Sequence, residues 1–171
     1  MSGTEWNMAE PFHFTVGAVG EPGAREFFFQ AVDNEAQVEV KCEKQQAAAL
    51  ADQLTRLLAD LPEPADAGSA ETAPVEALES TGSMFVVGSI SIGVDRTTNK
   101  IVVLFDELVL DPDDELEPID HDPMRLMVHL SHEQVLGFAA EAIRLSAAGR
   151  PICRLCSQPI DPQGHACPRL N

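Results

Sequence analysis

The spacing of the apolar residues constrains this fold most, because it changes from strand-like to helical twice along the chain. Alternating apolar and polar residues are typical of half-buried strands, whereas an apolar stripe at three- and four-residue spacing is typical of an amphipathic helix. Strand-like stretches occupy residues 12–19, 25–32 and 37–42, then 84–94, 100–105 and 124–130, and a helical stretch follows each set, at 44–61 and after Ser131. The pattern predicts an α+β fold of two βββα units with antiparallel sheets.

Turn and cap residues mark the ends of these elements. Residues 20–23 read Gly-Glu-Pro-Gly and predict a hairpin between the first two strands, because glycine adopts positive φ and proline fixes its own φ. Pro62 ends the first helix, and Ser131 with Gln134 has the capping-box spacing of a helix start. We therefore expect a first unit over residues 1–61, a second unit over 84–150 and a tail over 151–171.

The two units resemble each other, which suggests an internal repeat. Overlaying the helices brings Leu50 onto Phe138 and Arg56 onto Arg144. If the chain is duplicated, we expect the two sheets to be related by a pseudo-twofold axis. The alternative is that any two amphipathic α+β units look this similar.

Residues 62–83 between the units are rich in Pro, Ala, Glu, Ser and Thr and contain hardly any large apolar side chain. Such a segment buries too little apolar surface to offset the entropy of ordering it. We expect a mobile acidic linker.

Charge excludes several classes of partner. The chain of 171 residues carries 11 Lys and Arg against 28 Asp and Glu, a formal charge of −17, so nucleic acids and anionic membranes would repel it. No stretch is apolar over the roughly 20 residues of a membrane span, and the first residues lack the features of a secretion signal. We expect a cytoplasmic protein that neither binds nucleic acid nor inserts into a membrane.

Three of the four cysteines lie in the tail beside a histidine, as Cys153-x-x-Cys156 and His165-x-Cys167. A C-x2-C turn places two sulfurs on one edge of a tetrahedron, and the second pair completes the four ligands of one structural Zn²⁺. In a reducing compartment metal binding is favoured over disulfides. The alternatives are a redox dithiol of Cys153 and Cys156, or a frayed end. Cys42 stands apart and is expected to be a small buried side chain.

The tail also carries a more specific resemblance. Its motifs are Gly149-Arg150-Pro151, Cys153-x-x-Cys156, Pro159-Ile160-Asp161-Pro162, Gly164-His165 and Cys167-Pro168-Arg169, after a helix that begins Ser131-x-Glu133-Gln134-Val135. Together they resemble an actinobacterial family of conserved proteins catalogued as a domain of unknown function. The resemblance covers most of the chain. It implies no activity, and it links the family to neighbours resembling a lipid-kinase-like protein and a histidine phosphatase.

The chain departs from the pattern of that family at two positions. Members carry Gly after the second cysteine and Thr-Asn after the last Arg, where this chain has Ser157 and Leu170. Ser157 leaves the four ligands in place, but it puts in doubt the positive-φ turn that glycine would allow there.

Two other groups of residues are candidates for function. His121, His129 and His132 are candidates for a second metal or acid–base site, although their spacing fits no helical ligand pair and surface polar residues are the alternative. The acidic stretch 106–122 is a candidate contact for a basic partner through Asp113, Asp114, Glu115 and Glu117, and a solvated loop is its alternative.

No residues form a recognisable catalytic motif, since the chain has no Gly-rich phosphate loop, G-x-S-x-G elbow or dinucleotide fingerprint. The leading hypothesis is a noncatalytic acidic scaffold with a structural zinc site and a cytosolic protein partner, kinase-like or basic-surfaced. The alternative is an enzyme or small-ligand-binding protein with a pocket between the two units.

Overall fold

The computed structural model describes residues 4–21, 23–63, 72–109, 122–148, 153–158, 160 and 164–169. Its elements in chain order are β1 (Glu5–Met8), β2 (His13–Val19), β3 (Glu26–Val32), β4 (Gln37–Cys42), α1 (Lys44–Asp60), β5 (Phe85–Asp95), β6 (Lys100–Glu107), β7 (Arg125–Leu130) and α2 (His132–Ala147). The predicted α+β class and both βββα sequences of elements are confirmed. Strand β1 was not predicted, because four residues are too short for a periodic pattern.

The strands form one sheet in the order β1-β7-β6-β5-β4-β3-β2. We expected antiparallel sheets, but this sheet is mixed, since β4 pairs with β5 in parallel and β1 pairs with β7 in parallel. The parallel β4–β5 pair joins the two predicted units edge to edge. A parallel pair requires a crossover connection, which α1 and the residues after it supply.

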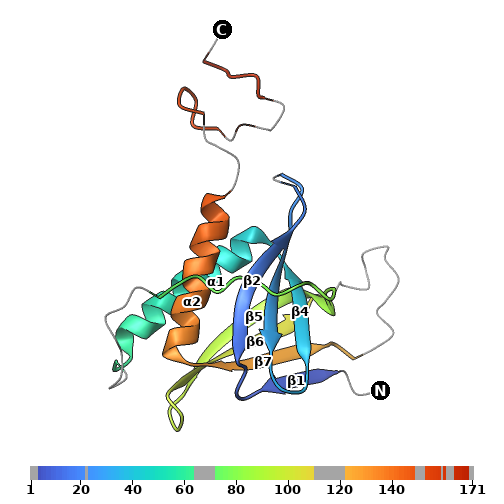
Figure 1. Ribbon diagram of the computed structural model, residues 1–171, viewed down its shortest axis with the longest axis vertical. Coiled ribbons are helices and arrows are strands. Elements are labelled where there is room, and N and C mark those ends of the chain that lie inside the picture. The colour runs from blue at the N-terminus through green and yellow to red at the C-terminus, as the bar shows by residue number, and fades with distance from the viewer. Residues whose placement is uncertain are drawn as a thin grey trace.

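Both helices cover the same face of the sheet, and α2 of the second unit lies over the strands of the first (Figure 1). Phe138 of α2 lies against Phe14 of β2 and Phe29 of β3, with ring centroids 5.1 and 6.0 Å apart. In turn, Gln46 of α1 donates a hydrogen bond to the Val87 carbonyl of β5 at 3.4 Å. The two units therefore share one hydrophobic core.

The expected pseudo-twofold axis is wrong. An axis between β4 and β5 would make these strands antiparallel or would place the two helices on opposite faces, and neither is found. Instead, the two units are related by a translation across the sheet, because their strands follow the same spatial order, β7-β6-β5 and then β4-β3-β2. Whether the two arose by duplication stays a prediction.

Residues 72–83, which we expected to be part of a mobile linker, form an extended segment bound to the sheet. We call these residues the strap. The Val75 N–H donates a hydrogen bond to the Gly137 carbonyl of α2. The segment then crosses the sheet face opposite the helices. There the Gln30 side chain forms hydrogen bonds with the backbone of Leu78, and the Glu39 carboxylate accepts one from the Thr81 N–H. The prediction considered only the apolar content of the segment. It failed because polar side chains of the sheet bind the strap through hydrogen bonds.

The close approach of the strap explains Gly137 and contributes at Gly17. A Cβ atom on Gly137 of α2 would lie 2.6 Å from a Val75 methyl group, whereas one on Gly17 of β2 would overlap the Phe28 ring of β3 and lie 2.8 Å from the Ala77 Cβ. A larger residue at Gly137 would displace Val75, and one at Gly17 would displace the Phe28 ring as well as the strap.

Candidate metal centre

The four predicted ligands of the tail lie together. The Sγ atoms of Cys153, Cys156 and Cys167 and a ring nitrogen of His165 all lie within 4.8 Å of one another. Two of the separations are 3.9 Å, between the Cys153 and Cys167 sulfurs, and 3.3 Å, from the Cys156 sulfur to His165 Nε2. A tetrahedral zinc with Zn–S bonds of about 2.3 Å requires sulfur–sulfur edges of roughly 3.8 Å. The cluster is already close to the dimensions that the ion needs.

Two short turns bring the ligands to this position. The Ser157 N–H donates to the Cys153 carbonyl at 2.9 Å and the Cys153 N–H donates to the Gln158 carbonyl at 2.8 Å, which closes a knuckle around the first pair. Gly164, with φ of 89°, turns the chain immediately before His165. Ser157 has φ of 59°, so the left-handed turn that a serine at this position put in doubt is present.

The knuckle also affects the protonation of the thiols. Backbone N–H groups of Cys156 and Leu155 bond to the Cys153 sulfur and lower the pKa of this thiol to about 7. At Cys156 the Gln158 N–H lowers the pKa, but burial and the neighbouring thiols outweigh it, so the pKa is raised. Cys153 therefore releases its proton before Cys156, and metal binding must displace the proton of Cys156.

The donor set fits zinc. Three sulfurs and one imidazole are the ligands of a Cys₃His site, and all four cysteines of the chain are free thiols. Because four protein atoms complete the tetrahedron, such a site has no open position for water or substrate, which is typical of structural zinc. Bound there, the ion would crosslink the two ends of the tail.

A family model described as "Protein of unknown function (DUF3090)" matches residues 6–167. The chain belongs to this family. The match runs from β1 of the DUF3090 domain to Cys167, the last of the four ligands, so the tail is part of the family domain. Neither the curated proteins nor the solved structures contain a match to this chain. The actinobacterial origin implied by the resemblance stays a prediction.

Of the three histidines considered for a second site, the two that the structure describes lie on opposite faces of the sheet. His121 lies outside the described residues. His129 sits on β7 between the buried Val128 and Leu130 and so faces away from the helices, whereas His132 is the first residue of α2 on the helix side. Among the described residues the tail cluster is the metal-ligand group that is found, and it includes neither histidine.

The structure describes Cys42 but not the four acidic residues proposed as a partner contact. Asp113, Asp114, Glu115 and Glu117 lie outside the described residues, so their role as a partner contact stays a prediction. Cys42 is buried in the core, as predicted, where burial and the nearby Glu43 raise the pKa of its thiol to about 12. This thiol is a packing group and not a nucleophile.

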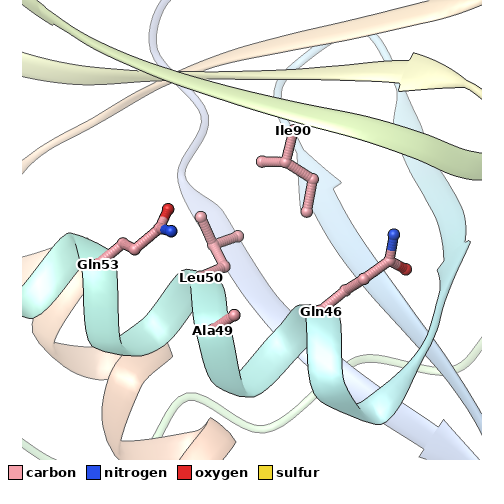
Figure 2. A pocket seen from close by; sticks show the side chains of 5 residues that line it. All are labelled: Gln46, Ala49, Leu50, Gln53 and Ile90. Carbon is pink, nitrogen blue, oxygen red and sulfur yellow. The ribbon is translucent and has the colours of Figure 1, made fainter.

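Two hollows lie beside α1. Gln46, Ala49, Leu50 and Gln53 of α1 and Ile90 of β5 line a shallow one of about 210 Å³, which contains no titratable group (Figure 2). The other, of about 430 Å³, lies between the end of α1, the β5–β6 turn and the start of α2. Its floor is apolar, with Leu58 and Ile101, and its rim includes His132 and Lys100.

Sequence reasoning missed one group of functional interest, a polar layer between the sheet and the strap. Glu39 of β4 is fully buried there. Burial by itself raises the pKa of its carboxyl, but hydrogen bonds from Ser80, the Thr81 N–H, Gln30 and Gln37 outweigh burial, and the pKa lies below its ordinary value. The available signal was weak: Gln30, Gln37 and Glu39 stand at polar positions of the strand pattern, which predicts exposure to solvent.

Proposed function

We propose that this member of the DUF3090 family is a noncatalytic cytoplasmic interaction protein whose tail is ordered by one structural Zn²⁺. The observation that carries the zinc proposal is the convergence of Cys153, Cys156, His165 and Cys167 within 4.8 Å. A redox dithiol would need only the first pair of cysteines, whereas here a third sulfur and an imidazole complete a tetrahedral donor set.

The tail has little else to hold it. Among its described residues only Cys153 and Cys167 are buried, and Arg154, Leu155 and Arg169 are exposed. A segment without an apolar core takes its order from the metal, which supplies on the order of 10 kcal/mol in small zinc modules. Exposed side chains on a rigid knuckle are then available to a partner.

Charge supports a basic protein as the partner. With a formal charge of −17 the chain attracts basic surfaces and repels polyanions. We propose that the basic surface of the partner contacts the acidic stretch of this chain, which includes Asp113, Asp114, Glu115 and Glu117. The kinase-like neighbour implied by the family resemblance is one candidate for such a partner. No helix among the described residues is long and apolar enough to span a membrane.

Metal analysis tests the zinc site. The purified protein should contain one zinc per chain, and cobalt substitution should give the intense visible bands of tetrahedral thiolate-bound Co²⁺. Cys156→Ser should abolish both signals, and Cys42→Ala, which removes the cysteine outside the cluster, should leave both unchanged. A wild-type protein purified under reducing conditions without metal would contradict the proposal.

Partner capture tests the interaction. The full chain and a chain lacking residues 151–171 should be compared as baits in native lysate at low and high salt. A basic protein should be retained by the full chain, released by salt and lost or weakened with the truncation. If no specific protein is retained by either bait, the scaffold function is wrong even if zinc is bound.

The hollow of about 430 Å³ favours the alternative function, a small-ligand-binding protein or enzyme, because it lies between the two units and combines an apolar floor with His132 on its rim. His129, the other histidine considered for this role, is on the opposite face of the sheet. A thermal-shift screen with small carboxylates and phosphates tests this alternative. A ligand that stabilises the wild type and not His132→Ala would support it, and the absence of any stabilising ligand would count against it.

A further inference from the structure

The outer face of strands β2, β3 and β4 holds the strap much as a binding protein holds an extended peptide. Gln30 accepts a hydrogen bond from the Leu78 N–H at 2.8 Å and donates one to the Leu78 carbonyl at 3.2 Å. Gln37 donates to the Glu79 carbonyl at 3.0 Å, and Thr15 donates to the Val75 carbonyl. Side chains of the sheet therefore bind the strap through hydrogen bonds to its main chain.

The strap turns little of its own sequence toward the sheet. Glu76, Leu78 and Glu79 are exposed, and Val75 and Ala77 are partly buried. The side chains that contact the polar layer are Ser80, whose hydroxyl donates to Glu39 Oε2 at 2.6 Å, and Thr81, whose hydroxyl donates to Glu39 Oε1 at 3.5 Å. Recognition mainly by main-chain hydrogen bonds, with these two hydroxyl contacts, allows a different extended segment to occupy the same face.

Glu39 indicates what that segment should carry. Its carboxylate is fully buried and accepts hydrogen bonds from neutral donors: Ser80, the Thr81 N–H, Gln30 and Gln37. No Lys or Arg among the described residues forms an ion pair with it, and Lys41, two residues along β4, is paired with Glu26 at 2.7 Å. A buried carboxylate without a cation is a favourable partner for a Lys or Arg that replaces the serine.

We propose that the strap is an internal stand-in for a peptide, and that the outer face of β2–β4 binds an extended basic segment of a protein partner whose Lys or Arg takes the place of Ser80 beside Glu39. The inference rests on the proposed function, since it names a surface for the basic partner. The strap competes with the partner from the same chain, at an effective concentration on the order of millimolar. The strap therefore covers the outer face of β2–β4 until a segment with higher affinity displaces it.

Peptide binding to the full chain tests the inference. The probes are a fluorescein-labelled peptide with the sequence of residues 73–83 and the same peptide carrying Ser80→Lys, measured by fluorescence anisotropy. A full chain in which residues 74–81 are replaced by Gly and Ser at equal length should bind the first peptide, and the Ser80→Lys peptide at least tenfold more tightly. The wild type should bind each peptide at least tenfold more weakly than the strap-replaced chain.

Glu39→Gln is the matched control, because a glutamine oxygen still accepts from Ser80 and Thr81 but does not pair with a cation. In the strap-replaced chain it should remove the preference for the Ser80→Lys peptide and keep binding of the unmodified peptide. A folded strap-replaced chain that binds neither peptide, or a wild type that binds as tightly as that chain, would overturn the inference.

A substitute variant and a lysate-capture comparison complete the test. If circular dichroism shows that the strap-replaced chain does not fold, Ser80→Ala with Thr81→Ala in the intact strap is measured in its place, and no gain in peptide affinity over the wild type counts against the inference. If lysate capture recovers a basic partner equally well with wild type and Glu39→Gln, the proposed function stands and this surface is excluded.

Discussion

The body, meaning the described residues between 4 and 148, and the tail, residues 153–169, differ in what surrounds their buried atoms. In the body a continuous apolar core includes Phe14, Phe29, Phe105 and Phe138, all at most 1% exposed. In the described tail the buried residues are the cysteines Cys153 and Cys167 themselves. The body can therefore fold by apolar burial, whereas the tail needs a metal ion. The comparison predicts that each part can be destabilised without the other.

The largest effect should come from removing a ligand of the tail. Cys167→Ser should lower zinc affinity by several orders of magnitude, because the whole site supplies on the order of 10 kcal/mol. Chelator competition measures the affinity, and hydrogen exchange should show loss of protection confined to residues 153–169. The thermal unfolding of the body should be unchanged. A matching fall in the melting temperature of the body would show that the two parts are coupled.

A core truncation should have the opposite distribution. Phe138→Ala removes the ring that packs on Phe14 and Phe29 and should lower the free energy of unfolding by about 3–5 kcal/mol. Denaturant unfolding followed by far-UV circular dichroism measures this loss, and the zinc content should remain one per chain. Ile143→Ala, on the same helix at a side chain 69% exposed, is the control and should change stability by less than about 0.5 kcal/mol.

The polar layer under the strap should give the body a dependence on pH. Hydrogen bonds outweigh burial and hold the pKa of Glu39 below its ordinary value, so its stabilising contribution is present above the unfolded pKa of about 4.3 and is lost as pH falls through the folded pKa. Glu39→Gln should cost about 1–2 kcal/mol at pH 7.

Denaturant unfolding at pH 7, 5 and 3 checks this pH dependence. The gap between wild type and Glu39→Gln should shrink toward pH 3, and a constant gap would contradict the prediction. Glu26→Gln, at an exposed ion pair with Lys41, should change stability by less than about 1 kcal/mol.

The smallest effect should come from the knuckle. Ser157 has a positive φ of 59°, which glycine adopts with less strain, so Ser157→Gly should stabilise the metal-bound tail by about 0.5–1 kcal/mol. Chelator competition should show zinc binding two- to fivefold more tightly. Gly164→Ala, at φ of 89°, is the matched change in the opposite direction and should weaken binding. Equal affinities for all three chains would show that neither turn limits the site.

Much of the fold was predictable because its signals are local. The alternation of residues 37–42 and the capping-box pair of Ser131 and Gln134 report on neighbours a few positions away, and the structure has β4 and the start of α2 at those places. The tail was predictable for a similar reason, since four ligands within 15 positions point to one ion. The pairing of β4 with β5, in contrast, depends on residues far apart in the chain, and no local pattern distinguishes a parallel from an antiparallel neighbour.

The amino-acid sequence by itself determined every element except β1, the order of those elements and the four residues that gather at the tail, because backbone propensity and ligand chemistry act over short separations. Only the tertiary structure decided that both units share one sheet, that α2 covers the strands of the first unit, and that the strap lies over Glu39. These outcomes are set by which distant surfaces bury each other. A polar strand residue such as Glu39 looks the same in the sequence whether water or the strap covers it, since Ser80, the strap residue that donates to it, is 41 positions away.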